Sequence, residues 1–151
     1  MQLSPNFSLA EFITSETAAR RGLSNEPDAE IIETLKATAA RLEEVRSLLG
    51  CPIIILSGFR SVKVNSAVGG SSNSQHCLGE AVDFIAPQFG TPQEVCRAIL
   101  DSTIEFDQLI AEGIDNANGG WCHIAFSDNP RRSVLTAHFH NGKAVYSQGV
   151  A

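Results

Sequence analysis

The hydrophobic residues of this chain change their spacing at Gly50, and this change limits the folds that the chain can adopt. Residues 52–57, which follow Gly50, form a short β-branched run that predicts a buried strand. Further strands are predicted at 81–86, 106–112, 121–126, 134–140 and 143–146. Before Gly50, apolar residues at helical spacing predict one long amphipathic helix: Ile31, Ile32, Leu35, Ala39, Leu42, Val45, Leu48 and Leu49. Because helices come first and a mostly antiparallel sheet comes later, the fold class is α+β.

Local signals place the shorter elements. Ser8–Glu11 and Thr91–Glu94 both have the form of a capping box, which predicts a helix start at each. A second short helix is predicted from Ser15 to Arg21. Residues 61–75 are rich in Ser, Asn and Gly and predict an irregular loop, and Asn141-Gly142 predicts a tight hairpin turn.

Composition limits the number of domains and the class of partner. The chain has 151 residues, of which 43% are hydrophobic, with no repeat or linker, so we expect a single domain over 1–151. Eleven Lys+Arg against seventeen Asp+Glu give a net charge of −6, which argues against nonspecific binding of nucleic acid. No stretch approaches the roughly 18–20 apolar residues of a transmembrane helix. We expect a monomer that binds no nucleic acid and does not insert into a membrane.

The N-terminal sequence has neither the basic region nor the long apolar run of a secretory signal, so we expect synthesis in the cytoplasm. Four dispersed cysteines could form two disulfides, but without a secretion signal we expect four free thiols: Cys51, Cys77, Cys96 and Cys122.

Three residues are candidate metal ligands: His76, Asp83 and His123. Two imidazoles and a carboxylate with an open fourth position are typical of a catalytic zinc site. Such a position allows the metal to acidify water and to polarise a carbonyl group. The alternative is that these are ordinary polar residues at strand ends.

The residues around these three carry a family resemblance. Ser74–Asp83 matches the pattern S-x-H-x-x-G-x-A-x-D, and Trp121–Ile124 matches W-x-H-[IV]. In this order the two motifs resemble the M15 family of zinc D-Ala-D-Ala carboxypeptidases and peptidoglycan endopeptidases, especially its compact branch from bacteriophages and prophages. The segments LSPNFSLAEF, IIILSGFRS and FDQLI also resemble that branch, so the likeness covers nearly the whole chain. It implies a hedgehog/DD-peptidase-type fold and one zinc ion held by His76, Asp83 and His123.

The resemblance also implies that Arg60 binds the substrate carboxylate or stabilises the developing oxyanion. An arginine at the exit of a strand, facing a Gly/Ser-rich loop, suits this role because its planar fork matches a carboxylate. The alternative is a surface salt bridge with one of the many carboxylates. Ser74 is a candidate substrate contact, or simply caps the loop.

The general base departs from the family pattern. Several branches place it three residues before the last zinc ligand, where this chain has Gly120. Our candidate is Glu112, because strand alternation puts Gln108 and Glu112 on one face, and the partner strand carries Trp121 and His123. On the same face, Gln108 is a candidate substrate contact and Trp121 a candidate pocket wall. The alternative for Glu112 is a solvated residue at a strand end.

We therefore expect a zinc metallopeptidase that hydrolyses amide bonds in peptidoglycan stem peptides or cross-links, as an endolysin or a D,D-carboxypeptidase does. It would reach the cell wall after release from the cytoplasm or inside a virion. An alternative is a noncatalytic module of the same fold, stabilised by zinc, that binds the wall or virion components. A third reading is a zinc dipeptidase that acts on free D-Ala-D-Ala.

Overall fold

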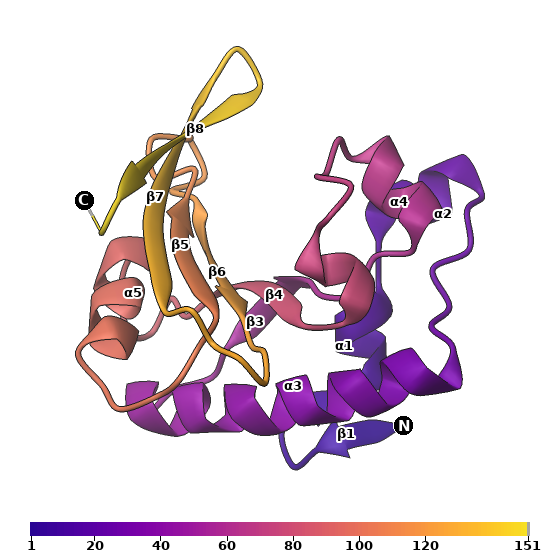
Figure 1. The fold of residues 1–151 in the computed structure, drawn as a ribbon, viewed down its shortest axis with the longest axis horizontal. Coiled ribbons are helices and arrows are strands. Elements are labelled where there is room, and N and C mark those ends of the chain that lie inside the picture. The colour runs from indigo at the N-terminus through magenta and orange to yellow at the C-terminus, as the bar shows by residue number, and fades with distance from the viewer. Residues whose placement is uncertain (151) are drawn as a thin grey trace. The chain divides into compact units, whose positions relative to one another are not determined.

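The computed structural model describes residues 1–150 and confirms the α+β class (Figure 1). The helices are α1 (Leu9–Ile13), α2 (Glu16–Arg21), α3 (Ala29–Leu49), α4 (Val62–Ala67), the 3-10 helix η1 (Gln75–Leu78) and α5 (Pro92–Leu100). The strands are β1 (Gln2–Ser4), β2 (Phe7–Ser8), β3 (Ile54–Ser57), β4 (Ala81–Ile85), β5 (Gln108–Glu112), β6 (Trp121–Ala125), β7 (Ser133–His140) and β8 (Lys143–Gln148). Within residues 1–150, no helix combines the length and the apolar character needed to cross a membrane.

Six strands form one sheet in the order β3-β4-β6-β5-β7-β8, and β1 and β2 form a separate small ladder. β5 pairs with β6 in antiparallel register and β7 pairs with β8 in the same way. The pair β5–β7 is parallel, so the sheet is mixed rather than wholly antiparallel. This arrangement is consistent with the fold that the resemblance implies.

Contacts divide the chain into two compact units, and the first comprises Met1–Glu43 and Ile55–Val82. Its core includes Phe7 and Phe12, whose rings meet edge to face with centroids 6.1 Å apart. Leu35 and Leu42, on the apolar face of α3, are fully buried in the same unit. Burial of these side chains is the main force that holds the unit together.

The second unit comprises Glu44–Ile54 and Asp83–Ala151. Here α5 packs against β5 and β6, and Ile99, Leu109 and Ile124 are fully buried. All four cysteines are free thiols, and two of them meet in this core, with Cys96 Sγ 3.3 Å from Cys122 Sγ. Burial, together with the neighbouring Cys96 thiol, raises the pKa of Cys122 well above its usual value. The expectation of one domain over 1–151 stays a prediction.

The helix starts follow their sequence signals. Capping boxes are present at Ser8 and at Thr91, each completed by the predicted glutamate three residues later. The Ser15 side chain accepts from the Ala18 amide and caps α2, so this helix begins at Glu16, one residue after the predicted start. At the other end of α3, Gly50 has a φ of +67°, a conformation that glycine adopts without strain and that ends the helix.

Two local predictions are wrong. Residues 52–57 do not form a buried strand, because β3 is an edge strand in which Ile54 and Leu56 are 49% and 50% exposed. Residues 61–75 are not an irregular loop throughout, because they contain α4 and the first residue of η1. The Ser61 side chain accepts from the Val64 amide and starts α4, and burial of Val64 stabilises it.

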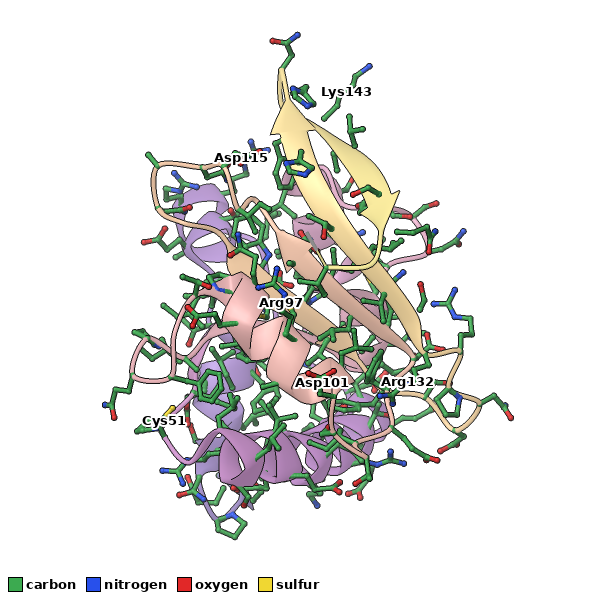
Figure 2. The ribbon with its side chains drawn as sticks, turned by 90° about the vertical axis from the view of Figure 1, so that its left-hand side faces the viewer. Cys51, Arg97, Asp101, Asp115, Arg132 and Lys143 are labelled. Atoms are coloured by element: carbon green, nitrogen blue, oxygen red, sulfur yellow. The ribbon has the colours of Figure 1, made fainter. Side chains whose placement is uncertain are left out.

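Two arginines fix the segment that leads into β5. Arg132 donates to the carbonyls of Leu100 and Ile104, and its guanidinium lies 4.6 Å from the centroid of the Phe106 ring. It lies beside the end of α5 (Figure 2). Arg131 forms a two-pronged ion pair with the buried Asp107, at 3.0 and 2.8 Å. These contacts hold the start of the strand whose other end carries Glu112.

Candidate metal centre

His76 lies in η1 and its ring is held by the backbone. The Ser74 hydroxyl caps η1 by accepting from the His76 amide at 3.2 Å, and Gly79 ends it with a φ of +78°. His76 is 2% exposed, and its Nδ1 lies 2.7 Å from the carbonyl oxygen of Gly58. Because a carbonyl only accepts, Nδ1 carries the hydrogen and Nε2 keeps the lone pair that a metal needs.

Asp83 and His123 come from β4 and β6. The Asp83 Oδ1 lies 3.0 Å from the His123 Nδ1, so this nitrogen of His123 faces the carboxylate. His123 is buried and Asp83 is nearly so. Burial of these polar groups is favourable only when charge or hydrogen bonding compensates the lost water.

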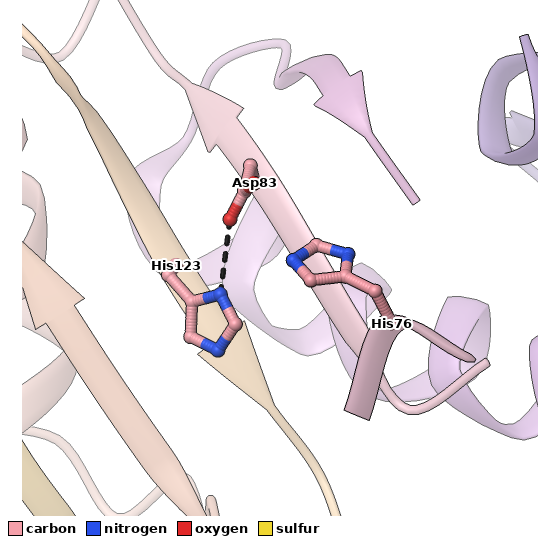
Figure 3. Close-up of side chains that lie close together, drawn as sticks. All are labelled: His76, Asp83 and His123. Atoms are coloured by element: carbon pink, nitrogen blue, oxygen red, sulfur yellow. Dashed lines mark hydrogen bonds and ion pairs between the residues drawn. The ribbon is translucent and has the colours of Figure 1, made fainter. Parts of the chain in front are cut away.

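The structure brings the three candidate ligands together (Figure 3). One ligand atom from each of His76, Asp83 and His123 lies within 4.8 Å of the other two. Zinc bonds to nitrogen and oxygen are roughly 2.0–2.2 Å long, so the ligand atoms of one tetrahedral zinc lie roughly 3.4 Å apart. Two imidazoles and one carboxylate at this spacing fit one zinc ion and leave a coordination position for water or substrate.

Glu112 ends β5 beside this group. In the antiparallel pair β5–β6, Glu112 is opposite Trp121, and Ile110 is opposite His123. The Glu112 Oε1 lies 3.7 Å from the His123 Nδ1. The Glu112 carboxylate, which strand alternation predicts near the metal group, therefore lies close to the ring of His123. Its role as a base stays a prediction.

Gly120 cannot carry a side chain in this backbone. Its φ is +80°, and a Cβ there would meet the carbonyl carbon and oxygen of Gly113 at 2.7 Å and the carbonyl oxygen of Glu112 still closer. The departure from the family pattern thus has a structural reason. The backbone after Glu112 occupies the space that an acidic side chain at position 120 would need.

Two aromatic residues of the last hairpin, Phe139 on β7 and Tyr146 on β8, also lie near Trp121 and Glu112. No motif in the sequence marks either residue. The Phe139 ring lies 5.9 Å from that of Trp121. Tyr146 is opposite Ala137 on β7, which is in turn opposite Glu112 on β5. Burial raises the pKa of Tyr146, and the Glu112 charge adds to this rise. The Asn-Gly turn gives the hairpin register, but the sequence holds no signal for the parallel pairing of β5 with β7.

Gln108 lies on the predicted face but away from Glu112. Gln108 is opposite Ala125 at the start of β5 and lies four positions before Glu112. Four positions along a strand correspond to a distance of roughly 13 Å. Its role as a substrate contact stays a prediction. Trp121 is half-buried and opposite Glu112, and its role as a pocket wall stays a prediction.

Arg60 follows β3 and is tied to His76 through the backbone. Its amide donates to the His76 carbonyl oxygen at 3.1 Å. No carboxylate of the described residues pairs with its guanidinium, so the structure does not show the alternative of a surface salt bridge. Burial raises the pKa of the neighbouring Cys77 thiol, while the positive charge of Arg60 acts in the opposite direction.

Comparison with known proteins now decides the family. A profile of the peptidase M15 family matches residues 5–125. The chain belongs to the peptidase M15 family. It is also 46% identical over 54 residues to a zinc D-Ala-D-Ala carboxypeptidase of Streptomyces albus G. That match covers 35% of this chain and 21% of the relative, so the chain spans about a fifth of the relative's length. The family that the two motifs indicate is thereby confirmed.

Proposed function

We propose that this M15 peptidase is a zinc enzyme that hydrolyses amide bonds in peptidoglycan stem peptides or cross-links. The observation that carries the proposal is the Glu112 carboxylate, 3.7 Å from the ring of His123 in the His–Asp–His group. The name of the Streptomyces relative supports both the metal and the class of substrate.

Each residue of the centre has a chemical task in this proposal. A zinc ion, when bound, supplies a Lewis acid that lowers the pKa of water and polarises a carbonyl. His76, Asp83 and His123 hold it, and the Gly58 carbonyl keeps the His76 ring in the tautomer that binds metal. Glu112 takes a proton from the attacking water and returns it to the leaving amine. Its side chain is 16% exposed, so it is largely shielded from solvent.

Further residues have a task in holding the substrate. Arg60, whose guanidinium has no carboxylate partner among residues 1–150, binds a substrate carboxylate or the developing oxyanion. Trp121 and Phe139 offer an aromatic wall beside Glu112. Ser74 keeps His76 in place by capping η1.

The test combines zinc content with analysis of products. Purified peptidoglycan is incubated with the zinc-loaded protein, and the released fragments are identified by mass spectrometry, which also names the bond that is cut. Glu112→Gln is expected to keep one zinc but to lose about 10²- to 10⁴-fold in turnover, the usual contribution of a general base. His76→Ala is expected to lose both zinc and turnover. His140→Ala is the control, because His140 is exposed on the last hairpin and is not part of the metal group.

The outcomes separate the alternatives. A metal-free His76→Ala protein that digests peptidoglycan as well as the wild type would refute the proposal. A wild type that binds zinc and releases no fragment supports a noncatalytic module. Cleavage of free D-Ala-D-Ala alone, with intact sacculi untouched, indicates a dipeptidase.

A further inference from the structure

The Arg60 side chain contains a buried donor without an acceptor. Its Nε is inaccessible to solvent and has no hydrogen-bond partner among the residues that the structure describes. A buried donor without a partner costs free energy and therefore calls for an explanation at each place where it occurs. The groups that surround the guanidinium of Arg60 offer an explanation for this unpartnered donor.

Asn65, in α4, contains the complementary atom. It is 4% exposed, and its Nδ2 donates to the Ser71 carbonyl at 2.8 Å. This bond assigns the two ends of the amide, because the Ser71 carbonyl accepts and the amide oxygen of Asn65 has no hydrogen to donate. The Oδ1 is thus the buried acceptor, and it has no partner within residues 1–150.

The two side chains converge on Gly70. A Cβ on Gly70 would meet the Asn65 Cγ at 2.8 Å, with the Asn65 Oδ1 nearer still, and the Arg60 Nη1 at 3.0 Å. The Gly70 amide also donates to the Asn65 carbonyl oxygen at 2.9 Å, which holds this glycine against Asn65. The missing side chain of Gly70 therefore leaves room for an amide oxygen and a guanidinium to approach each other.

We propose that Asn65 is a positioning residue for Arg60. When a substrate is bound, the Asn65 Oδ1 accepts from the guanidinium a hydrogen bond that this oxygen does not make in the present structure, and the bond turns the planar fork toward the terminal carboxylate of the substrate. A neutral acceptor suits this task, because it orients Arg60 without neutralising its charge. A carboxylate at position 65 would compete with the substrate. The inference rests on the proposed function and concerns the substrate carboxylate that Arg60 is proposed to bind.

The test measures binding separately from turnover. Zinc-loaded protein is titrated with N-acetyl-D-Ala-D-Ala and with its C-terminal amide, with NMR as the readout and mass spectrometry to verify that the ligand is intact. The wild type is expected to prefer the carboxylate. Asn65→Ala is expected to weaken binding of the carboxylate about tenfold, below the full value of a charged hydrogen bond, and to leave the amide unchanged. In an Arg60→Ala background, Asn65→Ala is expected to have no further effect, since it acts through Arg60.

A second variant covers the case in which Asn65→Ala does not fold. Gly70→Ala places a methyl group where Asn65 and Arg60 meet. We expect this variant to bind the ligand with the free carboxylate more weakly and to bind the amide ligand as the wild type does. Gly69→Ala is the matched control, because a Cβ there has nothing within 4 Å although its φ is +74°. The inference would be overturned if Asn65→Ala weakened binding of both ligands equally, or if its effect added to that of Arg60→Ala. It would also be overturned if the wild type bound the two ligands equally well. Selective binding without any hydrolysis would instead refute the proposed function alone.

Discussion

Gly120 offers the sharpest test of how this centre is built, because Gly119 beside it serves as a control. The two glycines have nearly the same φ, +83° and +80°. An alanine at either position meets the left-handed backbone penalty, about 1–2 kcal/mol. A Cβ on Gly119 has nothing within 4 Å, whereas one on Gly120 meets the Gly113 carbonyl carbon and oxygen at 2.7 Å.

The difference between the two variants follows from this contact. Ordinary contact begins near 3.4 Å, so in Gly120→Ala the backbone after Glu112 has to move by several tenths of an ångström or more. Crowding of this kind adds about 1–3 kcal/mol of destabilisation. We expect Gly119→Ala to lower the free energy of unfolding by about 1–2 kcal/mol, and Gly120→Ala by about 2–5 kcal/mol.

Urea unfolding monitored by circular dichroism measures both values, and turnover is measured in parallel. Because the shifted backbone carries Glu112, only Gly120→Ala is expected to lose turnover as well as stability. Gly120→Asp, which restores an acid at the position used by several family branches, is expected to fail as a replacement base in the Glu112→Gln protein. Equal destabilisation by the two alanines, or rescue by Gly120→Asp, would show that the backbone of 112–113 does not exclude a side chain.

Two further predictions concern the second unit. Arg131→Ala removes the guanidinium that binds the buried Asp107 at 2.8 Å. We expect the free energy of unfolding in urea to fall by about 1–2 kcal/mol, less than for a fully buried pair because the Arg131 side chain is 61% exposed. Lys36→Ala, which breaks an exposed pair with Glu33, is the control and is expected to change stability by less than about 0.5 kcal/mol. Hydrogen bonds from Thr91, from its backbone first and its hydroxyl second, lower the pKa of Glu94 in the folded state. The ionised form therefore stabilises the fold above the unfolded pKa, and this contribution is lost as the pH falls through the folded pKa. The melting temperature of the wild type should exceed that of Glu94→Gln at pH 7, with a gap that closes as the pH falls through the lowered pKa of Glu94. A constant gap would contradict this assignment.

The features that the sequence predicts well are those that depend on neighbouring residues. The capping boxes at Ser8 and Thr91, the helix end at Gly50 and the turn at Asn141-Gly142 are all where their local chemistry places them. The candidate metal ligands also belong to this group, because two short motifs mark them and the structure brings them together.

The features that the sequence does not predict depend on distant contacts. Four of the six residues of α4 are Val, Asn or Ser, which have modest helix propensity, and the helix forms because Ser61 caps it and Val64 is buried. The exposure of β3 depends on its place at the sheet edge, which strand composition does not determine. The constraint on Gly120 comes from the backbone of Glu112 and Gly113, eight and seven residues earlier, across a loop. Asn65 carries no sequence signal apart from its presence in a Ser-, Asn- and Gly-rich segment.

The contact between Phe12 and Gly58 has a consequence for anyone who shortens or fuses this chain. The Phe59 amide donates to the Phe12 carbonyl oxygen at 2.7 Å, and a Cβ on Gly58 would meet that oxygen at 2.5 Å, so α1 is pressed against the segment 58–59. The Gly58 carbonyl is the group that orients His76. The first helix is therefore part of the scaffold of a candidate metal ligand rather than a dispensable leader. Truncation past Phe12 would remove a support of the His76 ring.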